Sequence, residues 1–229
     1  MAIIRTIDVE KTYQDNGVPV RALRGVSMTV DSGEFTVIAG PSGSGKTTLL
    51  NIIGALDKPT GGEVFLEETD LSTLKRTELS DLRLNKIGFV FQAYNLIPVL
   101  SALENVEFTM MLSNVPEKER HDRAMQILDE LGIAELADKR PNEMSGGQQQ
   151  RVAAARAIVN NPSLVLADEP TANLDSATGA ELLNLMEQMN RERNITFVFS
   201  SHDPQVIERA HRLLTLKDGK IVEDTRGSA

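Results

Sequence analysis

Two glycine-rich stretches carry residue types that can bind phosphate. The first, GPSGSGKT at 40–47, has the pattern G-x-x-x-x-G-K-[ST], and its glycines let backbone amides turn inward toward phosphate oxygens. The second, MSGGQQQR at 144–151, places two glycines just before a run with helical character. A helix N-terminus also attracts anions. The chain therefore has two candidate phosphate-binding stretches, and the need for the second one requires an explanation.

The first stretch has the surroundings that its motif requires. A short apolar strand pattern at 35–40 leads into it, and a helical pattern begins at Lys46. Lys46 can reach β- and γ-phosphates, and the Thr47 hydroxyl can bind Mg²⁺. An ordinary Gly/Ser turn is the alternative, but the lysine, the threonine and both flanking elements favour a magnesium nucleotide. We expect contacts with it from Gly40, Ser42, Gly43, Ser44, Gly45, Lys46, Thr47 and Thr48.

An acidic pair follows a predicted buried strand at 163–168. Asp168 ends that strand, where ligands of open α/β sheets gather, and we expect it to act on the metal, through water. Glu169 follows, and its carboxylate could orient or deprotonate the attacking water. A solvent-exposed strand end is the alternative. The phosphate-binding stretch elsewhere in the chain favours the catalytic interpretation.

Two further predicted strands end in polar side chains. Gln92 closes IGFVFQ and could ligate the metal or hold water, while His202 directly follows ITFVFSS and could hydrogen-bond a γ-phosphate. A lone histidine is usually structural. The position of His202 after a core strand favours a role at the site, whereas the other two histidines lie in polar helical stretches.

The elements that must position these residues form an α/β pattern. The first third reads as strands, 93–160 reads as helical, and the last third alternates apolar strands with a helix and a final hairpin. Apolar strands separated by helices indicate a parallel sheet covered on both faces. We expect one domain over 1–229, in which 1–92 and 161–229 form the core and a β subdomain, and 93–160 an inserted helical subdomain.

Composition limits the function classes. Apolar residues make up 41% of the 229, and the net charge is −9 from 24 basic and 33 acidic residues. Such an acidic chain is a poor general ligand for nucleic acid or anionic lipid, so a protein partner must hold it at any membrane. No run of apolar residues is long enough for a membrane span, we expect no signal peptide, and the absence of cysteine excludes disulfides.

The stretch 40–47, Gln92, MSGGQ, LVLADEP, NLD at 173–175 and His202 occur in the order and spacing of the ATP-binding subunits of ABC transporters. The chain resembles this family over essentially its whole length. The resemblance implies a P-loop NTPase (RecA-like) core, an antiparallel β subdomain and an α-helical subdomain, with ATP and Mg²⁺ as cofactors. It also implies that Tyr13 stacks on adenine. A strand residue packing on the β subdomain is the alternative for Tyr13.

The resemblance also offers an answer to the question of two stretches. In this family two copies face each other head to tail, and each ATP lies between the phosphate loop of one copy and the second stretch of the other. Asp175 would line the seam between the copies. Lys46, Glu169 and His202 would be catalytic, and the residues of the second copy that would contact ATP are Ser145, Gly146, Gly147 and Gln148.

A narrower match concerns residues 89–106, FVFQAYNLIPVLSALENV. This segment is similar to the corresponding segment of the subgroup that includes lipoprotein-releasing and macrolide-exporting ATPases. Those ATPases work at the cytoplasmic face of the inner membrane. The partner would be a transmembrane permease, held by the helical subdomain and the segment after Gln92. The apolar residues of that segment either form a groove for a helix of the permease or pack inside the subdomain: Tyr94, Leu96, Ile97, Pro98, Leu100 and Leu103.

Two other functions fit the same motifs. A soluble family member acting on nucleic acid or ribosomes usually has two cassettes or a long insertion after the glutamine. This chain has neither feature, and its acidic charge opposes binding to nucleic acid. A cytoplasmic ATPase of a non-transporting system, such as a cell-division or peptide-sensing relative, has the same ATP-hydrolysing motifs. Its sequence is therefore hardly distinguished from that of a transporter subunit.

Overall fold

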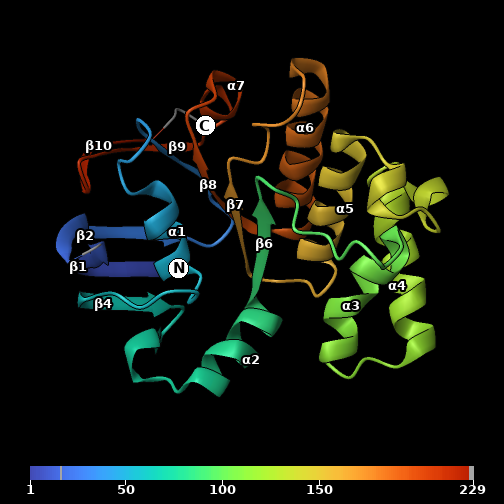
Figure 1. Ribbon diagram of the computed structural model, residues 1–229, viewed down its shortest axis with the longest axis horizontal. Helices are drawn as coiled ribbons and strands as arrows, with labels where there is room; N and C mark the ends of the chain where they lie inside the picture. Colours follow the sequence, from blue (N-terminus) through green and yellow to red (C-terminus); the bar gives the residue numbers. More distant parts are fainter. Residues whose placement is uncertain (16, 227–229) are drawn as a thin grey trace.

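The computed structural model describes residues 1–15 and 17–226, which form two sheets with helices around them (Figure 1). The smaller sheet has the order β2-β1-β4-β5, and its pairs are all antiparallel. Along β2 the residues from Val26 to Val30 alternate between buried and exposed, as their sequence predicts for a strand with one buried face. The strands are β1 (Ala2–Asp15), β2 (Val18–Asp31), β4 (Gly61–Leu66) and β5 (Thr69–Asp70).

The larger sheet has the order β10-β9-β3-β8-β7-β6. Its strands are parallel except β10, which pairs antiparallel with β9 at one edge. Asp218 and Gly219 form the predicted turn between these two strands, with φ of 48° and 77°. The strands are β3 (Phe35–Ala39), β6 (Ile87–Phe91), β7 (Leu164–Asp168), β8 (Thr196–Ser201), β9 (Arg212–Lys217) and β10 (Lys220–Arg226).

The register of the parallel strands brings their carboxyl ends together. Ala39 pairs with Ser201, Ser200 with Asp168, and Asp168 with Phe91. The residues that follow these strand ends therefore emerge at one edge of the sheet. This alignment is what gathers the phosphate loop, Glu169, Gln92 and His202.

Both faces of the larger sheet are buried. Val37 and Val165 belong to one hydrophobic cluster, while Ile38 and Leu164 belong to the other, because successive strand residues point to opposite faces. The first cluster includes residues of α3, α5 and α6; the second includes residues of α1 and the smaller sheet. The structure thus matches the α/β fold with an antiparallel β sheet and helical segments that the sequence predicted.

The helical stretch contains α3 (Ala102–Leu112), α4 (Glu117–Glu130) and α5 (Gly146–Ile158), with short 3-10 turns η2 (Ala134–Leu136) and η3 (Pro141–Glu143). The helices begin at Ala102 rather than near Ala93, because Tyr94 and Asn95 take φ of 58° and 51°, which no right-handed helix accepts. Pro116 lies at the N-cap of α4, directly before its first turn.

The other helices are α1 (Lys46–Ile53), α2 (Arg76–Lys86), α6 (Ser176–Arg193) and α7 (Pro204–Glu208), with η1 (Leu71–Thr73) before α2. No pattern in the sequence predicted α2, because Leu79 is its one buried residue and the rest of the helix is largely polar. Among the described residues, no helix has the length and apolar character needed to cross a bilayer.

Candidate nucleotide-binding site

The phosphate loop depends on glycine at two tight positions. A Cβ on Gly40 would lie 2.1 Å from the Leu216 carbonyl oxygen, and one on Gly45 would lie 2.6 Å from the Ala22 carbonyl oxygen. Gly45 is also the N-cap of α1, with φ of 104° and no side-chain cap. The first amides of α1 are therefore left for an anion, as a helix N-terminus at a phosphate site requires.

Lys46 lies folded over this loop. Its side chain is 8% exposed, and Nζ donates to the carbonyl oxygens of Gly40 at 2.8 Å and Pro41 at 3.2 Å. The nearest carboxylate oxygen, Oε1 of Glu169, is 4.0 Å away. The ammonium group is thus held at the mouth of the loop, where it can contact phosphate oxygens.

Thr47 and Asp168 meet beside the loop. The Thr47 hydroxyl donates to Oδ1 of Asp168 at 3.2 Å, and the Ser200 hydroxyl donates to the same oxygen at 2.8 Å. A hydroxyl and a carboxylate are ligands that suit Mg²⁺, which takes few protein ligands beside phosphate oxygens and water. The described residues contain no cluster of three or more His, Asp or Glu side chains that could hold a metal alone. The donor set therefore fits a metal that arrives with a nucleotide.

Glu169 is held in a strained backbone conformation. Its φ is 47°, in the left-handed region that non-glycine residues avoid. Its N–H donates to the Ser200 carbonyl at 2.9 Å, and the Ser201 hydroxyl donates to Oε2 at 3.1 Å. Oε1 lies 2.7 Å from Nδ1 of His202. Strain of this kind is common at functional sites, where surrounding contacts maintain it.

A cavity of about 410 Å³ joins these groups. This volume lies within the range of small-molecule sites. It brings together most of the residues expected from the phosphate loop and the strand ends, together with the unpredicted Val20, Arg21, Ala22 and Ala172. The lining residues are Val20, Arg21, Ala22, Ser42, Gly43, Gly45, Lys46, Thr47, Thr48, Gln92, Glu169, Ala172 and His202.

Tyr13 lies outside this cavity lining, on β1. Its ring is 38% exposed, its hydroxyl donates to Oδ2 of Asp57 at 2.8 Å, and Nζ of Lys11 lies 4.8 Å from the ring centroid. Partial burial and the bond to Asp57 raise the pKa of the Tyr13 hydroxyl, which also interacts with Thr48 of α1. The hydroxyl thus ties Tyr13 to Asp57, in the loop that follows α1.

The second glycine-rich stretch is placed elsewhere. Ser145 caps α5: its Oγ accepts from the Gln148 N–H at 3.3 Å, and Gln148 Oε1 accepts from the Ser145 N–H at 2.8 Å. A Cβ on Gly146 would lie 2.8 Å from the Tyr94 hydroxyl, and one on Gly147 would lie 2.3 Å from Cγ2 of Thr178. Close packing therefore accounts for both glycines. No residue of 144–151 lines the cavity that holds the phosphate loop.

Asp175 caps α6 beside this stretch. Its carboxylate accepts from the Ala177 and Thr178 amides and from the Thr178 hydroxyl, and these hydrogen bonds, first that of the hydroxyl, lower the pKa of Asp175. Asn173, two residues before Asp175, connects this cap to the nucleotide cavity, because its Nδ2 donates to the carbonyl of the cavity residue Gln92 at 2.9 Å.

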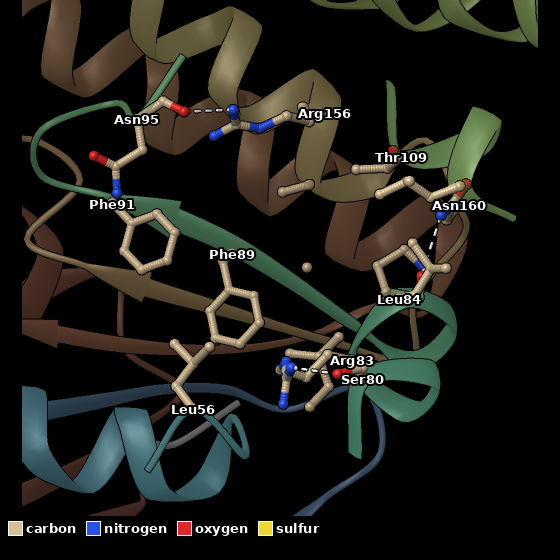
Figure 2. Close-up of a pocket in the computed structure, with 15 residues that line it drawn as sticks. Leu56, Ser80, Arg83, Leu84, Phe89, Phe91, Asn95, Thr109, Arg156 and Asn160 are labelled. Atoms are coloured by element: carbon tan, nitrogen blue, oxygen red, sulfur yellow. Dashed lines mark hydrogen bonds between the residues drawn. The ribbon is translucent and has the colours of Figure 1, made fainter. Parts of the chain in front are cut away.

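A separate apolar cavity of about 460 Å³ lies between α2, β6 and α5 (Figure 2). Phe89 and Phe91 stack along β6 with ring centroids 5.6 Å apart. Of the six apolar residues that the sequence offered after Gln92, none lines this cavity, and Leu96 and Leu103 pack against the core cluster instead. The packing alternative thus holds for Leu96 and Leu103, and the groove for a permease helix stays a prediction for this segment. The apolar lining is Leu56, Leu84, Ile87, Phe89, Phe91, Leu112, Ala157 and Pro162.

Comparison with known proteins decides the family. A sequence profile described as ABC transporter matches residues 23–172. The chain belongs to the ABC transporter family. This ABC ATPase chain is 48% identical to an uncharacterized ABC transporter ATP-binding protein of Thermotoga maritima, over 96% of the chain and 93% of that protein. The resemblance stated from its motifs is confirmed.

Other relatives join the cassette to a permease. The chain is 47% identical to the macrolide export ATP-binding/permease protein MacB of Rhodospirillum rubrum over 97% of its own length, but it spans only 34% of that protein. Among solved structures it matches the dimeric ATP-binding cassette MJ0796 of Methanocaldococcus jannaschii in a post-hydrolysis state bound to ADP and Pi. That match has a TM-score of 0.92 and 43% identity, and covers 99% of both chains. The chain is an ABC transporter ATP-binding subunit with ATPase activity.

Proposed function

We propose that two copies of this chain close head to tail around two ATP molecules, hydrolyse them and so drive a membrane partner. One observation carries the proposal. The second glycine-rich stretch contains the N-terminus of α5, where Ser145 is exposed and Gly146 to Gln148 are half-buried, and no residue of it lines the cavity of its own chain. The dimeric state of the solved cassette MJ0796 supports the same arrangement.

The roles within one copy follow from the contacts. Lys46 and the loop amides bind the β- and γ-phosphates. Thr47, Gln92 and Asp168 would hold Mg²⁺, which supplies positive charge to the phosphate oxygens. Glu169 orients and deprotonates the attacking water, because its carboxylate is fixed by Ser201 and His202 and lies within reach of Lys46. His202 hydrogen-bonds the γ-phosphate.

The roles between copies complete the site. Ser145, Gly146, Gly147 and Gln148 of the second copy present the start of α5 to the γ-phosphate, with the helix dipole favouring the negative charge. Asp175 lines the seam. ATP binding closes the dimer and loss of the γ-phosphate opens it, so hydrolysis becomes motion through an ATP-dependent interface.

The cavity between α2, β6 and α5 is our candidate for the permease contact. Beside its apolar lining stand Arg83 and Arg156, and neither has a carboxylate partner among the described residues. Arg156 instead donates to the carbonyls of Asn95 at 2.6 Å and Tyr94 at 2.9 Å, and burial lowers its pKa. Figure 2 shows Arg156 and Asn95 at one side of the stacked phenylalanines and Arg83 at the other.

A short helix with an apolar face and an acidic residue would fit this groove, because it would fill the lining and pair with the arginines. We assign it to the membrane partner, since relatives carry cassette and permease in one chain. We propose that residues 93–160 form the subdomain that this helix moves, that the chain works at the cytoplasmic face of the inner membrane, and that the complex exports small molecules. Macrolide and pyoverdine exporters among the relatives support export. Lipoprotein release stays a prediction from the sequence.

The Glu169→Gln variant tests this function. It keeps the size of the side chain and its phosphate-site neighbours but removes the base, so ATP should bind and hold a stable dimer. We expect hydrolysis to fall by about 10²–10⁴-fold, the usual contribution of a general base. Light scattering with ATP and phosphate release measure the two effects. Turnover at the wild-type rate, or a variant that stays monomeric with ATP, would reject the assignment.

A further inference from the structure

Gln150 is a fully buried polar side chain on α5, within the second glycine-rich stretch and about one turn after Gly146. Its Nε2 donates to the Pro170 carbonyl oxygen at 2.8 Å. Its Oε1 is buried and has no hydrogen-bond partner within the described part of the chain. No role in the proposed function accounts for this amide.

The bond ends at the residue that follows Glu169. Glu169 has a strained φ of 47°, and a following proline narrows the backbone choices of the residue before it. Contacts from β8 hold Glu169 on one side, through Ser200, Ser201 and His202. Gln150, on α5, holds the backbone of the next residue, Pro170.

The unpartnered oxygen indicates why a glutamine stands here. A buried amide oxygen without a donor is destabilising, and an apolar side chain of similar length would fill the same space without that cost. The feature that only glutamine supplies is the Nε2 donation to Pro170. One helix therefore connects the amides that start at Gly146 with the backbone that carries Glu169.

We propose that Gln150 is a positioning residue that couples the two ATP sites of the dimer. This inference rests on the head-to-tail arrangement proposed above. The start of α5 contacts the ATP held by the partner, whereas Glu169 acts on the ATP held by its own chain. When the partner's ATP engages α5, the Gln150 amide carries that displacement to Pro170 and sets the Glu169 carboxylate. Each site then becomes competent in response to the other.

The Gln150→Met variant tests the coupling in the full chain. Methionine keeps an unbranched, helix-compatible side chain and removes the donor. We expect kcat to fall about tenfold or more, since small displacements of a catalytic group have effects of this size. The ATP concentration for half-saturation should stay within about twofold. The Hill coefficient for ATP should fall toward one, an effect that a purely structural role would not produce.

Gln149→Met is the matched control. Gln149 is the neighbouring glutamine on α5, but its Nε2 donates to the Met144 carbonyl at 3.0 Å and does not reach the Glu169 segment. This variant should keep the wild-type rate and Hill coefficient. A second test variant, Gln150→Asn, retains an amide but shortens it by one methylene, so it should show the same loss if the methionine variant folds poorly.

Several results would overturn the coupling. One is a Gln150→Met or Gln150→Asn enzyme that keeps the wild-type kcat and Hill coefficient. A second is a loss of kcat that equals the loss of folded protein. A third is a wild-type enzyme that binds ATP without cooperativity. Failure of the proposed function looks different. It appears in a chain that keeps Gln150, as a Glu169→Gln protein that forms no dimer with ATP.

Discussion

Nδ1 of His202 lies 2.7 Å from Oε1 of Glu169, and the two residues come from the ends of neighbouring parallel strands. His202 is 72% exposed at its side chain, whereas Glu169 is 14% exposed. The histidine thus covers the carboxylate from the open side of the cavity. It contacts the proposed base and also lines the cavity that would hold the γ-phosphate.

Replacement of His202 by alanine should uncouple chemistry from binding. The Glu169 carboxylate loses one of its two side-chain hydrogen-bond partners, so we expect kcat to fall about 10–10³-fold while ATP affinity changes little. Phosphate release and nucleotide titration measure the two quantities. His211→Ala is the control, since the His211 ring lies tilted against Phe35, with ring centroids 5.7 Å apart, and is outside the cavity lining. An unchanged kcat in the His202 variant would contradict this role.

The Tyr13 hydroxyl offers a test of the adenine platform. Tyr13→Phe keeps the ring but loses the bond to Asp57, worth about 0.5–1.5 kcal/mol, so KM for ATP should rise a few-fold with kcat unchanged. Tyr13→Ala should raise KM further, because the stacking surface is gone. Asp57→Asn keeps an acceptor for the hydroxyl and serves as the control. If Tyr13→Ala leaves KM unchanged, Tyr13 only packs on the strand.

The C-terminal hairpin should lose stability in acid. Arg212 is buried, and its guanidinium donates to both oxygens of Asp224 at 2.8 and 2.7 Å. The hydrogen bonds from Arg212 lower the pKa of the Asp224 carboxyl below its ordinary value of 3.8. A lowered folded-state pKa means that the stabilisation is fully present above the ordinary value and is lost as pH falls through the folded one.

Asp224→Asn should therefore be less stable than wild type at pH ~7, and the difference should shrink as the pH falls below the ordinary value of 3.8. Urea unfolding across this pH range measures the difference. Asp218→Asn, in the turn of the same hairpin with φ of 48°, should show no such convergence, since asparagine tolerates that conformation. A difference that stays constant with pH would rule out the ion pair as the cause.

Local patterns predicted most of the fold. The strands that lead into Gly40 and Glu169 are short apolar runs between turn residues, and the helix of 117–130 shows its buried face at i, i+3 and i+4. The phosphate loop could be found because its motif lies within one stretch of chain. These features depend on residues that are close together in the chain, so a local sequence pattern is enough to predict them.

Other features depend on neighbours in space. The helix α2 buries little, so its period was hidden, and the apolar cavity that it lines draws its residues from elements far apart in sequence. Gln150 looked like one of three glutamines in a row until its amide was found on Pro170. Ser200 and Ser201 read as the end of a strand, but they orient Asp168 and Glu169 across the sheet. The residue types gave no signal for these contacts.

The central claim is that the second glycine-rich stretch completes the site of another copy. Ser145→Arg in the Glu169→Gln background tests it most directly. Ser101→Arg is the matched control, because Ser101 caps α3 with the same capping box and its loss should cost a similar ~1 kcal/mol of stability. Nucleotide titration reports binding by each monomer, and sedimentation with ATP reports the dimer.

We predict that the Ser145→Arg protein binds ATP with nearly unchanged affinity and stays monomeric, while the Ser101→Arg protein dimerises. Equal loss of ATP binding and dimerisation in the Ser145 variant, or a stable dimer with ATP despite the arginine, would contradict the shared site.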